Sequence, residues 1–471
     1  MKKFFALLLS VVLILCFASC AGGGSPSVSS ATAKDETSSA SATSDDKNST
    51  STSSEKSSSS QEQTSSKPQL SNSKPVSSKP AVISHDKIVA KGAAYSVGEN
   101  AEKVYKAGER MPAKCNDFDA YIYGDYKYTY FNSHFDAMSG DEDIPPGWIV
   151  KVLDNTKKQY GEILSSINGQ PVVTLLYTFS GCKSLLVAPE IPKTVVGLTQ
   201  TFSGCESLVQ TPKIPDHITW LEWTFEGCSS LTKVTNFPKN IERLEGTFAY
   251  CTSLKTVPNF PDKTKTLSQT FRGCTSLVDV PEIPKSVTWM SWAFMGCTSL
   301  VNAPEIPENV TDMTSTFEGC TSLVTAPKIP KKITRLYNTF KGCTALVNIP
   351  TIPENVIGLD GTFEGCTSLK NAPVIHNKMK FLNNTFKDCT SLEKAPVIPE
   401  SVEAMNETFM NCTALGGEVI INAQIAERGY VYHEFGCVNC FRGTVKPISI
   451  VGSCNEKSSL AGTSLNRNVS Y

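Results

Sequence analysis

Cysteine is the residue type in this chain whose spacing most invites a chemical interpretation. Eleven of the 17 cysteines recur every 23 residues, each three residues after a phenylalanine, from Cys182 to Cys412. Such a series could form disulfides, ligate a metal, or stay reduced and buried as small apolar side chains with a weak donor. The choice depends on how the repeats stack.

Stacking geometry favours the reduced state. Copies of a repeat that pair as parallel strands lie ~4.8 Å apart with parallel Cα–Cβ bonds, whereas a disulfide needs Cβ atoms ~3.8 Å apart on converging bonds. Eleven is also an odd number, and a single file does not bring four metal ligands together. We therefore expect the eleven cysteines to be reduced and buried, each offering its S–H to a turn carbonyl.

The cysteines after the last repeat are a separate case. Cys437 and Cys440 form a CxxC motif, with Cys454 nearby in the chain. We favour a local disulfide over a metal site. A redox centre is the least favoured reading, because no pattern of strand, turn and helix leads into the motif.

No other set of residues predicts catalysis or a bound cofactor. The histidines do not recur with a nucleophile and an acid, and no glycine-rich phosphate loop follows a strand. The acidic run Asp141, Glu142 and Asp143, with Asp136, lacks the spacing of a calcium loop and indicates a solvated turn. The sequence thus predicts no enzyme, no metal site and no cofactor. The five histidines are His85, His134, His217, His376 and His433.

The 23-residue spacing indicates a solenoid, in which each unit buries its apolar side only against its neighbours. Pro212 and Pro215 exclude a helix through the unit, because proline removes a backbone donor and clashes with the preceding turn. We expect an α+β or mainly β solenoid of eleven coils, spanning ~50 Å if neighbouring coils pair as strands. The paired piece is Leu208–Ile214 or Ile218–Trp223, with some pairing expected in the second. The core positions of one unit are Phe202, Cys205, Leu208, Ile214, Ile218 and Leu221.

The composition divides the chain into five segments. Lys2 and Lys3 precede an apolar run, and Phe17–Cys20 resembles the lipobox in which the cysteine of a bacterial lipoprotein is acylated. We predict lipidation at Cys20, with acyl chains as the only membrane anchor. The net charge of −1 gives no reason to expect nucleic-acid binding. The predicted segments are an export signal at 1–19, a disordered Ser/Thr-rich stalk at 20–85, an N-terminal cap at 86–162, the solenoid at 163–415 and a C-terminal cap at 416–471.

The N-terminal cap contains several local signals. Gly124-Asp125 separates two alternating tyrosine-rich segments and predicts a two-residue hairpin turn. Gly147–Leu153 is a further strand candidate, and Tyr160–Ile167 has the pattern of a short amphipathic helix that ends at Asn168-Gly169. The simplest role for this region is to cover the open end of the solenoid. Its tyrosines could instead bind sugar or protein, because Tyr combines apolar area with a polar tip.

The repeat resembles a known family. The segment Cys274–Val287, followed by Ala293-Phe294, is similar to the 23-residue unit of BspA-type leucine-rich repeats in bacterial surface proteins. The likeness covers about 163–410, and Ile283-Pro284 falls one residue later than the usual apolar-Pro step. The resemblance implies a leucine-rich repeat solenoid in a surface protein that acts by binding. It also implies that the Leu277–Ile283 type of segment is the concave strand.

A binding role directs attention to positions that vary between copies of a constant scaffold. The slot of Trp220 holds polar residues in other repeats, which indicates exposure. Two Trp pairs lie three repeats apart, or ~14 Å along the axis. Exposed Trp favours a ligand face, although the rings could instead fold over the solenoid edge and cover neighbouring side chains. The predicted ligand-face residues are Trp220, Trp223, Arg243, Trp289, Trp292, Arg335 and Tyr337.

These observations predict a bacterial surface lipoprotein, held on the extracellular face of the cytoplasmic membrane by its lipid anchor. Its solenoid is expected to bind protein partners in adhesion to a host, a matrix or other cells. The alternatives are a carbohydrate-binding surface protein that uses its exposed aromatic residues, and a structural spacer. The expected ligand is therefore a protein or a glycan on a host or neighbouring cell.

Overall fold

The computed structural model describes residues 120–131, 135–136, 143–424, 437–452 and 469–470. These lie in the second of two compact units, Lys79–Tyr471. In the described part we find ten short strands and no helix, hence no helix that could cross a membrane. The predictions that lie outside the described residues concern the export signal, Cys20, the stalk, the start of the N-terminal cap, Cys454, Asp141, Glu142, His85, His134 and His433.

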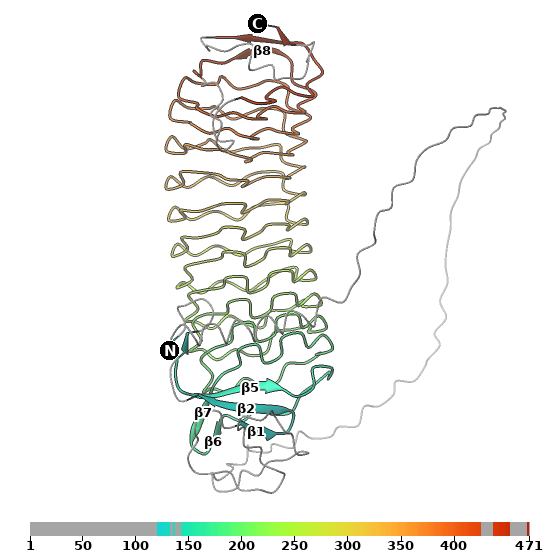
Figure 1. Ribbon diagram of the computed structural model, residues 1–471, viewed down its shortest axis with the longest axis vertical. Helices are drawn as coiled ribbons and strands as arrows, with labels where there is room; N and C mark the ends of the chain where they lie inside the picture. Colours follow the sequence, from blue (N-terminus) through green and yellow to red (C-terminus); the bar gives the residue numbers. More distant parts are fainter. Residues whose placement is uncertain (1–119, 132–134, 137–142, 425–436, 453–468, 471) are drawn as a thin grey trace, which may run out of the picture. The chain divides into compact units, whose positions relative to one another are not determined.

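A five-stranded sheet in the order β1-β2-β5-β7-β6 joins the described part of the predicted N-terminal cap to residues 166–174, at the start of the predicted solenoid (Figure 1). β1 (Ala120–Tyr123) and β2 (Tyr126–Phe131) form the predicted hairpin around Gly124-Asp125. The strand predicted near residue 150 is confirmed as β5 (Gly147–Val152), which pairs antiparallel with β2. The remaining strands of this region are β3 (Phe135–Asp136), β4 (Asp143–Ile144), β6 (Ser166–Ile167) and β7 (Gln170–Thr174).

The helix predicted at Tyr160–Ile167 is wrong, because the segment is extended and ends in β6. Its backbone bonds to side chains of the cap: Leu164 N–H donates to the Tyr128 hydroxyl at 3.1 Å. Asn168 and Gly169, with φ of 49° and 78°, form the two-residue turn of the β6–β7 hairpin. The apolar side chains at the helix-like spacing are still buried, since they join the same core cluster as the repeats.

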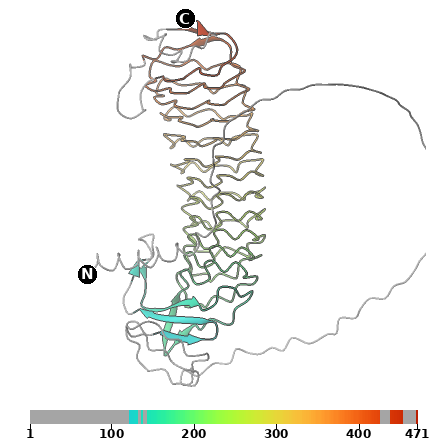
Figure 2. The same cartoon turned by 45° about the vertical axis from the view of Figure 1, so that its right-hand side comes forward.

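Each 23-residue repeat forms one coil, and successive coils stack along one axis (Figures 1 and 2). Backbone N–H groups of one coil donate to carbonyl groups of the next. Regular strands do not form in the repeats; parallel bridges join single residues, such as Trp220 and Arg243 in the expected Ile218–Trp223 piece. The other expected piece, of the Leu277–Ile283 type, also pairs through single parallel bridges, as between Gln210 and Lys233 and between Asn302 and Thr325. Leu277–Ile283 itself contains no bridge, and Pro281 there has no N–H to donate.

A stack of phenylalanine rings runs through the core. From Phe179 to Phe409, neighbouring ring centroids are 5.2–5.9 Å apart and ring planes differ by at most 14°. The stack continues to Phe441, whose ring is 5.5 Å from that of Phe409. Phe441 belongs to a partial twelfth coil, since Phe409 N–H donates to Cys440 O at 2.9 Å. In this coil Cys440–Thr444 repeats the Thr-Phe-x-Gly-Cys pattern with Cys and Thr exchanged.

The eleven repeat cysteines are free and buried, which confirms the predicted reduced series. From Cys205 to Cys412, each Sγ donates to the carbonyl oxygen of the phenylalanine in the preceding repeat at 3.0–3.2 Å. Burial raises the pKa of these thiols, to about 12 at Cys343 and Cys412. The series therefore consists of protonated thiols that act as hydrogen-bond donors.

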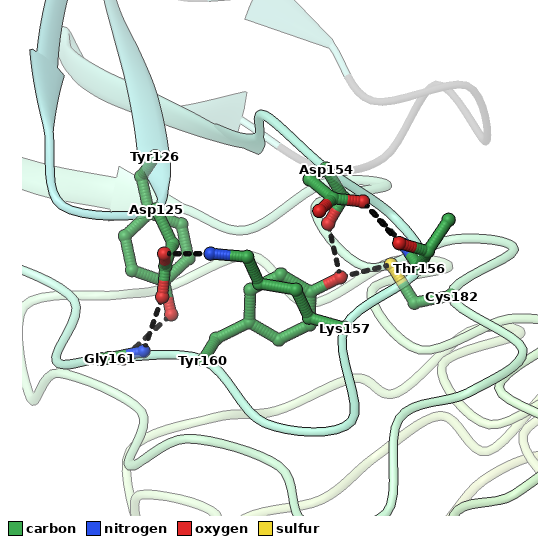
Figure 3. A network of polar contacts seen from close by, with 8 residues as sticks. All are labelled: Asp125, Tyr126, Asp154, Thr156, Lys157, Tyr160, Gly161 and Cys182. Carbon is green, nitrogen blue, oxygen red and sulfur yellow. Dashed lines mark hydrogen bonds and ion pairs between the residues drawn. The ribbon is translucent and has the colours of Figure 1, made fainter. Parts of the chain in front are cut away.

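The first thiol has no preceding repeat, and the N-terminal cap supplies its partner (Figure 3). The Tyr160 hydroxyl lies 3.4 Å from Sγ of Cys182 and donates to Asp154 O at 2.7 Å. The ring of Tyr160 meets that of Phe179 edge to face, with centroids 5.2 Å apart. One side chain thus ends both the thiol series and the phenylalanine stack.

The β1–β2 hairpin turn holds the same segment in place. Asp125 accepts hydrogen bonds from Lys157 Nζ at 2.6 Å and from Gly161 N–H at 2.8 Å. These two bonds lower the pKa of the Asp125 carboxyl. The Tyr126 hydroxyl donates to Gly161 O at 2.7 Å, so both backbone groups of Gly161 are bonded to the hairpin. The contacts fix the cap sheet to the first coil (Figure 3).

At the C-terminal end, three parallel strands continue the stacking in the order β10-β9-β8. Cys437 and Cys440 form the predicted local disulfide beside the partial twelfth coil. The strands are β8 (Gly417–Ile420), β9 (Ile448–Val451) and β10 (Val469–Ser470).

The buried thiols predict a loss of stability at alkaline pH. Each thiol ionises near its ordinary value of 9.0 in the unfolded chain but only near 12 at Cys343 in the folded one. Unfolding therefore releases protons in this window, and the free energy of unfolding should fall above about pH 9 by about 1.4 kcal/mol per pH unit for each such thiol. Thermal unfolding followed by circular dichroism from pH 7 to 11 in reductant would measure this fall, and Cys343→Ala should lessen its slope. A melting temperature constant to pH 11 would contradict it.

Candidate ligand-binding face

The seven predicted ligand-face residues lie in three neighbouring columns, where a column is one position of the repeat followed through successive coils. Trp220, Arg243 and Trp289 belong to a column joined by parallel bridges through Thr266. Arg335 continues this column and is bridged to the next coil. The other two columns lie two and three positions further along the repeat. We call the full set the aromatic strip: Trp220, Trp223, Arg243, Trp289, Trp292, Arg335 and Tyr337.

The column of Trp223 and Trp292 has a left-handed backbone in every repeat. The φ angles are 54° at Trp223 and 56° at Trp292. The conformation belongs to the coil, and the N–H of this residue donates to the next coil, as from Trp223 to Glu245 O at 2.9 Å. Left-handed φ suits Gly and Asn, whereas a bulky residue there costs on the order of 1–3 kcal/mol. The other residues of the column are Tyr177, Gln200, Gly246, Gln269, Ser315, Asn338, Gly361, Asn384 and Glu407.

A glycine of the following coil makes room for the ring of Trp223. A Cβ atom on Gly246 would lie 2.3 Å from the Trp223 ring, so the ring lies directly over this glycine. Tyr250 repeats the arrangement in a second left-handed column, with φ of 60° and its ring over Gly273. Sequence reasoning missed Tyr250. The available signal was a tyrosine at the position that is glycine in most repeats.

The two Trp pairs differ in exposure. Trp220 and Trp223 are half-buried, so their rings do fold over the edge of the solenoid. Trp289 and Trp292 are 57% and 39% exposed. The half-buried pair fits the covering role, and a ligand face at the exposed pair stays a prediction.

The arginines of the strip are held by neighbouring groups. Arg243 Nε lies 2.7 Å from Oε1 of the buried Glu222. Burial raises the pKa of the Glu245 carboxyl in the next coil, and the Glu222 carboxylate raises it further. The guanidinium of Arg335 lies 5.5 Å from the ring centroid of Tyr337 and donates a hydrogen bond to its hydroxyl. Fixed cationic groups beside exposed aromatic rings form a surface suited to recognition.

The strip offers no constellation for catalysis. Among the residues that the structure describes, no three His, Cys, Asp or Glu side chains lie close enough to hold a metal ion. The two described histidines, His217 and His376, belong to turns of different repeats, and His217 Nε2 lies 2.7 Å from Val195 O. The arrangement can bind a ligand by ring stacking, charge and hydrogen bonding.

The left-handed backbone at Trp292 predicts that an asparagine is tolerated there. Trp292→Asn relieves strain at a position that is Asn in two other repeats, which offsets the lost ring contacts. We expect the free energy of unfolding to be unchanged or higher by up to about 1 kcal/mol, measured by chemical denaturation. A decrease above about 1 kcal/mol would show that the ring mainly stabilises the fold. Phe294→Asn in the core of the same repeat should unfold the protein and serves as the opposite reference.

A family model described as the BspA type leucine rich repeat region matches the chain in six copies, over residues 175–278, 246–359 and 290–416. No curated protein matches the chain.

Several solved structures of leucine-rich repeat proteins are similar at low sequence identity. One from Bacteroides ovatus is 22% identical, with 71% of this chain and 96% of that chain covered and a TM-score of 0.42. A leucine rich cell surface protein from Faecalibacterium prausnitzii is 21% identical, with coverage of 65% and 95% and a TM-score of 0.37. The pneumococcal vaccine antigen PcpA is 14% identical, with coverage of 71% and 87% and a TM-score of 0.41.

Proposed function

The chain belongs to the BspA-type leucine-rich repeat family, and on this premise we propose that it is a bacterial surface protein whose solenoid binds a protein partner through the aromatic strip. The role is binding, in adhesion to a host, a matrix or neighbouring cells. No catalytic step is assigned to the strip.

The observation that carries the proposal is the left-handed backbone under Trp223 and Trp292. Most other repeats place Gly, Asn, Ser, Gln or Glu at this position without loss of the coil, so stacking does not require an aromatic side chain there. Strained residues persist where function uses them. Trp is also the side chain most enriched among residues that dominate binding energy.

Further support comes from the chemistry of the strip. Arg243 and Arg335 place cations beside the rings, which suits the mixed surface of a protein partner. The buried Nε1 of Trp220 has no hydrogen-bond partner among the described residues. An unpaired buried donor costs free energy, and an acceptor on a partner could offset it after a small movement of the ring.

A second candidate function is carbohydrate binding, favoured by the exposed face of Trp289. An indole ring offers a flat apolar surface with a polar edge, which suits a sugar ring as well as a protein. A purely structural spacer is the remaining alternative, and it predicts no ligand.

The proposed location is the cell surface, with the chain held by lipid at Cys20. The support is the export signal at 1–19 and the lipobox-like Phe17–Cys20. Mass spectrometry of the N-terminal fragment from cells would detect the acylated cysteine, and Cys20→Ala should release the protein into the medium.

Paired substitutions on the strip test the function. The full chain carrying Trp289→Ser and Trp292→Asn should lose its partner in pull-downs from host-cell and community surface extracts. Val278→Thr with Val301→Thr, exposed apolar residues outside the strip, should retain it. Equal capture by both double variants would contradict the strip as the binding site, and no capture by the parent would favour a spacer.

The carbohydrate alternative has its own test. Retention of the parent on immobilised polysaccharides, lost in Trp289→Ala with Trp292→Ala, would favour glycan binding. If the parent is not retained, or if the double variant is retained like the parent, this alternative fails.

A further inference from the structure

One surface column of the solenoid alternates in charge from coil to coil. The column consists of the residue that follows the second proline of each repeat. In one repeat His376 replaces that proline, and the column residue is Asn377. Like charges that face each other on adjacent strands ~4.8 Å apart destabilise the pair, so stacking favours alternation. The pattern predicts a cation in the ninth place, but Asn377 stands there, followed by the acidic Glu400. The first eight members are Lys193, Asp216, Lys239, Asp262, Lys285, Glu308, Lys331 and Glu354.

Two other columns break at the same corner. His376 stands where the repeats before and after it have the second proline. Val374 and Val397 occupy a slot that holds only charged or polar residues in the preceding repeats, and they are 83% and 50% exposed. In three separate columns the residue type thus departs from the pattern of the earlier repeats, all within neighbouring coils. Stacking alone does not require these departures.

The corner contains a hollow of about 700 Å³. Its wall combines the apolar Ile375 and Val397 with the polar Asn377, Glu400 and Asn422, together with Ser401. The volume falls within the range of small-molecule and side-chain pockets. The lining is apolar along one part and polar along another, so it can recognise an amphipathic group.

Polar groups at the hollow are left without partners. In other repeats the residue in the slot of Ser401 bonds to carbonyl groups of the preceding coil, as Ser286 Oγ does to Asp262 O at 2.7 Å. Oγ of Ser401, which lines the hollow, is buried and has no hydrogen-bond partner in the described structure. The same holds for Nε2 of His376, which stands in the chain between the lining residues Ile375 and Asn377. Unpaired buried polar atoms of this kind are costly unless a ligand or water satisfies them.

The carboxylates on either side of Asn377 differ in their pairing. Glu354 Oε2 lies 3.8 Å from Lys378 Nζ. Glu400 has no ion-pair partner among the described residues. The carboxylate of Glu400, which has no ion-pair partner among the described residues, therefore borders the hollow next to Asn377, where the column lacks its cation.

From these features we propose that the hollow binds a primary ammonium group on an aliphatic stem, such as a lysine side chain of a partner protein or a free alkylamine. The stem packs on Ile375 and Val397, as lysine stems do on apolar surfaces. The ammonium donates to the Glu400 carboxylate and to the amide oxygen of Asn377, in the place of the missing lysine. This site is separate from the aromatic strip and does not depend on it.

The binding test uses the full chain and three probes in calorimetric titrations. These are n-butylammonium, the peptide acetyl-Gly-Lys-Gly-amide, and the same peptide with norleucine in place of lysine. Both amines should bind and the norleucine peptide should not. Glu400→Gln should weaken amine binding about tenfold, since a charge-assisted bond is lost. Glu308→Gln, in the same column four repeats earlier, should leave binding unchanged.

A second variant tests the site by filling it. Asn377→Lys supplies the ammonium from the chain itself and restores the alternation. It should raise the melting temperature and abolish amine binding. Equal binding of the lysine and norleucine peptides, or full amine binding by Asn377→Lys, would overturn the proposal. Binding of the peptide but not of n-butylammonium would identify a protein partner as the source of the amine. Trp292→Asn should not affect these titrations, so the outcome is independent of the aromatic strip.

Discussion

The contact on which this structure depends is the stacking of each residue on its own counterpart in the next coil. A spacing of ~4.8 Å leaves every side chain with two copies of its position as nearest neighbours. In the core this favours identical residues, which is why phenylalanine and cysteine do not vary from Phe179 to Cys412. At the surface the same spacing disfavours like charges in succession, and the column from Lys193 to Glu354 avoids them. Constancy inside and alternation outside thus have one physical cause.

The sequence predicted the parts of the fold that follow from this constraint. The solenoid, the reduced thiols and the phenylalanine positions all follow from period and residue type. The helix at Tyr160–Ile167 was wrong because apolar spacing of three and four also suits an extended segment buried on several sides. The Asn168-Gly169 pair was a hairpin turn, and it was taken for a helix end. The partial twelfth coil escaped notice because Phe441 lies 32 residues after Phe409 (441 − 409), not 23.

The residues of the candidate binding face could be predicted from the sequence, but their backbone conformation could not. Variable slots pointed to Trp289 and Trp292, and the structure shows both to be exposed. The left-handed backbone under Trp292 could not be read from the sequence, because Trp carries no signal for positive φ. Variability also has a second origin that sequence reasoning overlooked. Much of the variation at Lys193 and its successors reflects charge alternation, so a variable slot is not by itself a functional one.

The contacts at the two ends of the stack influence how the number of repeats can change during evolution. Tyr160 ends the thiol series on one side and Phe441 ends the ring stack on the other, and neither contact involves the central coils. Whole units can therefore be duplicated or deleted between them without disturbing either end. The alternating column adds a rule of parity: gaining or losing an even number of units preserves the order of signs, whereas an odd number brings like charges together. Lineages of this protein should accordingly differ most readily by multiples of two repeats.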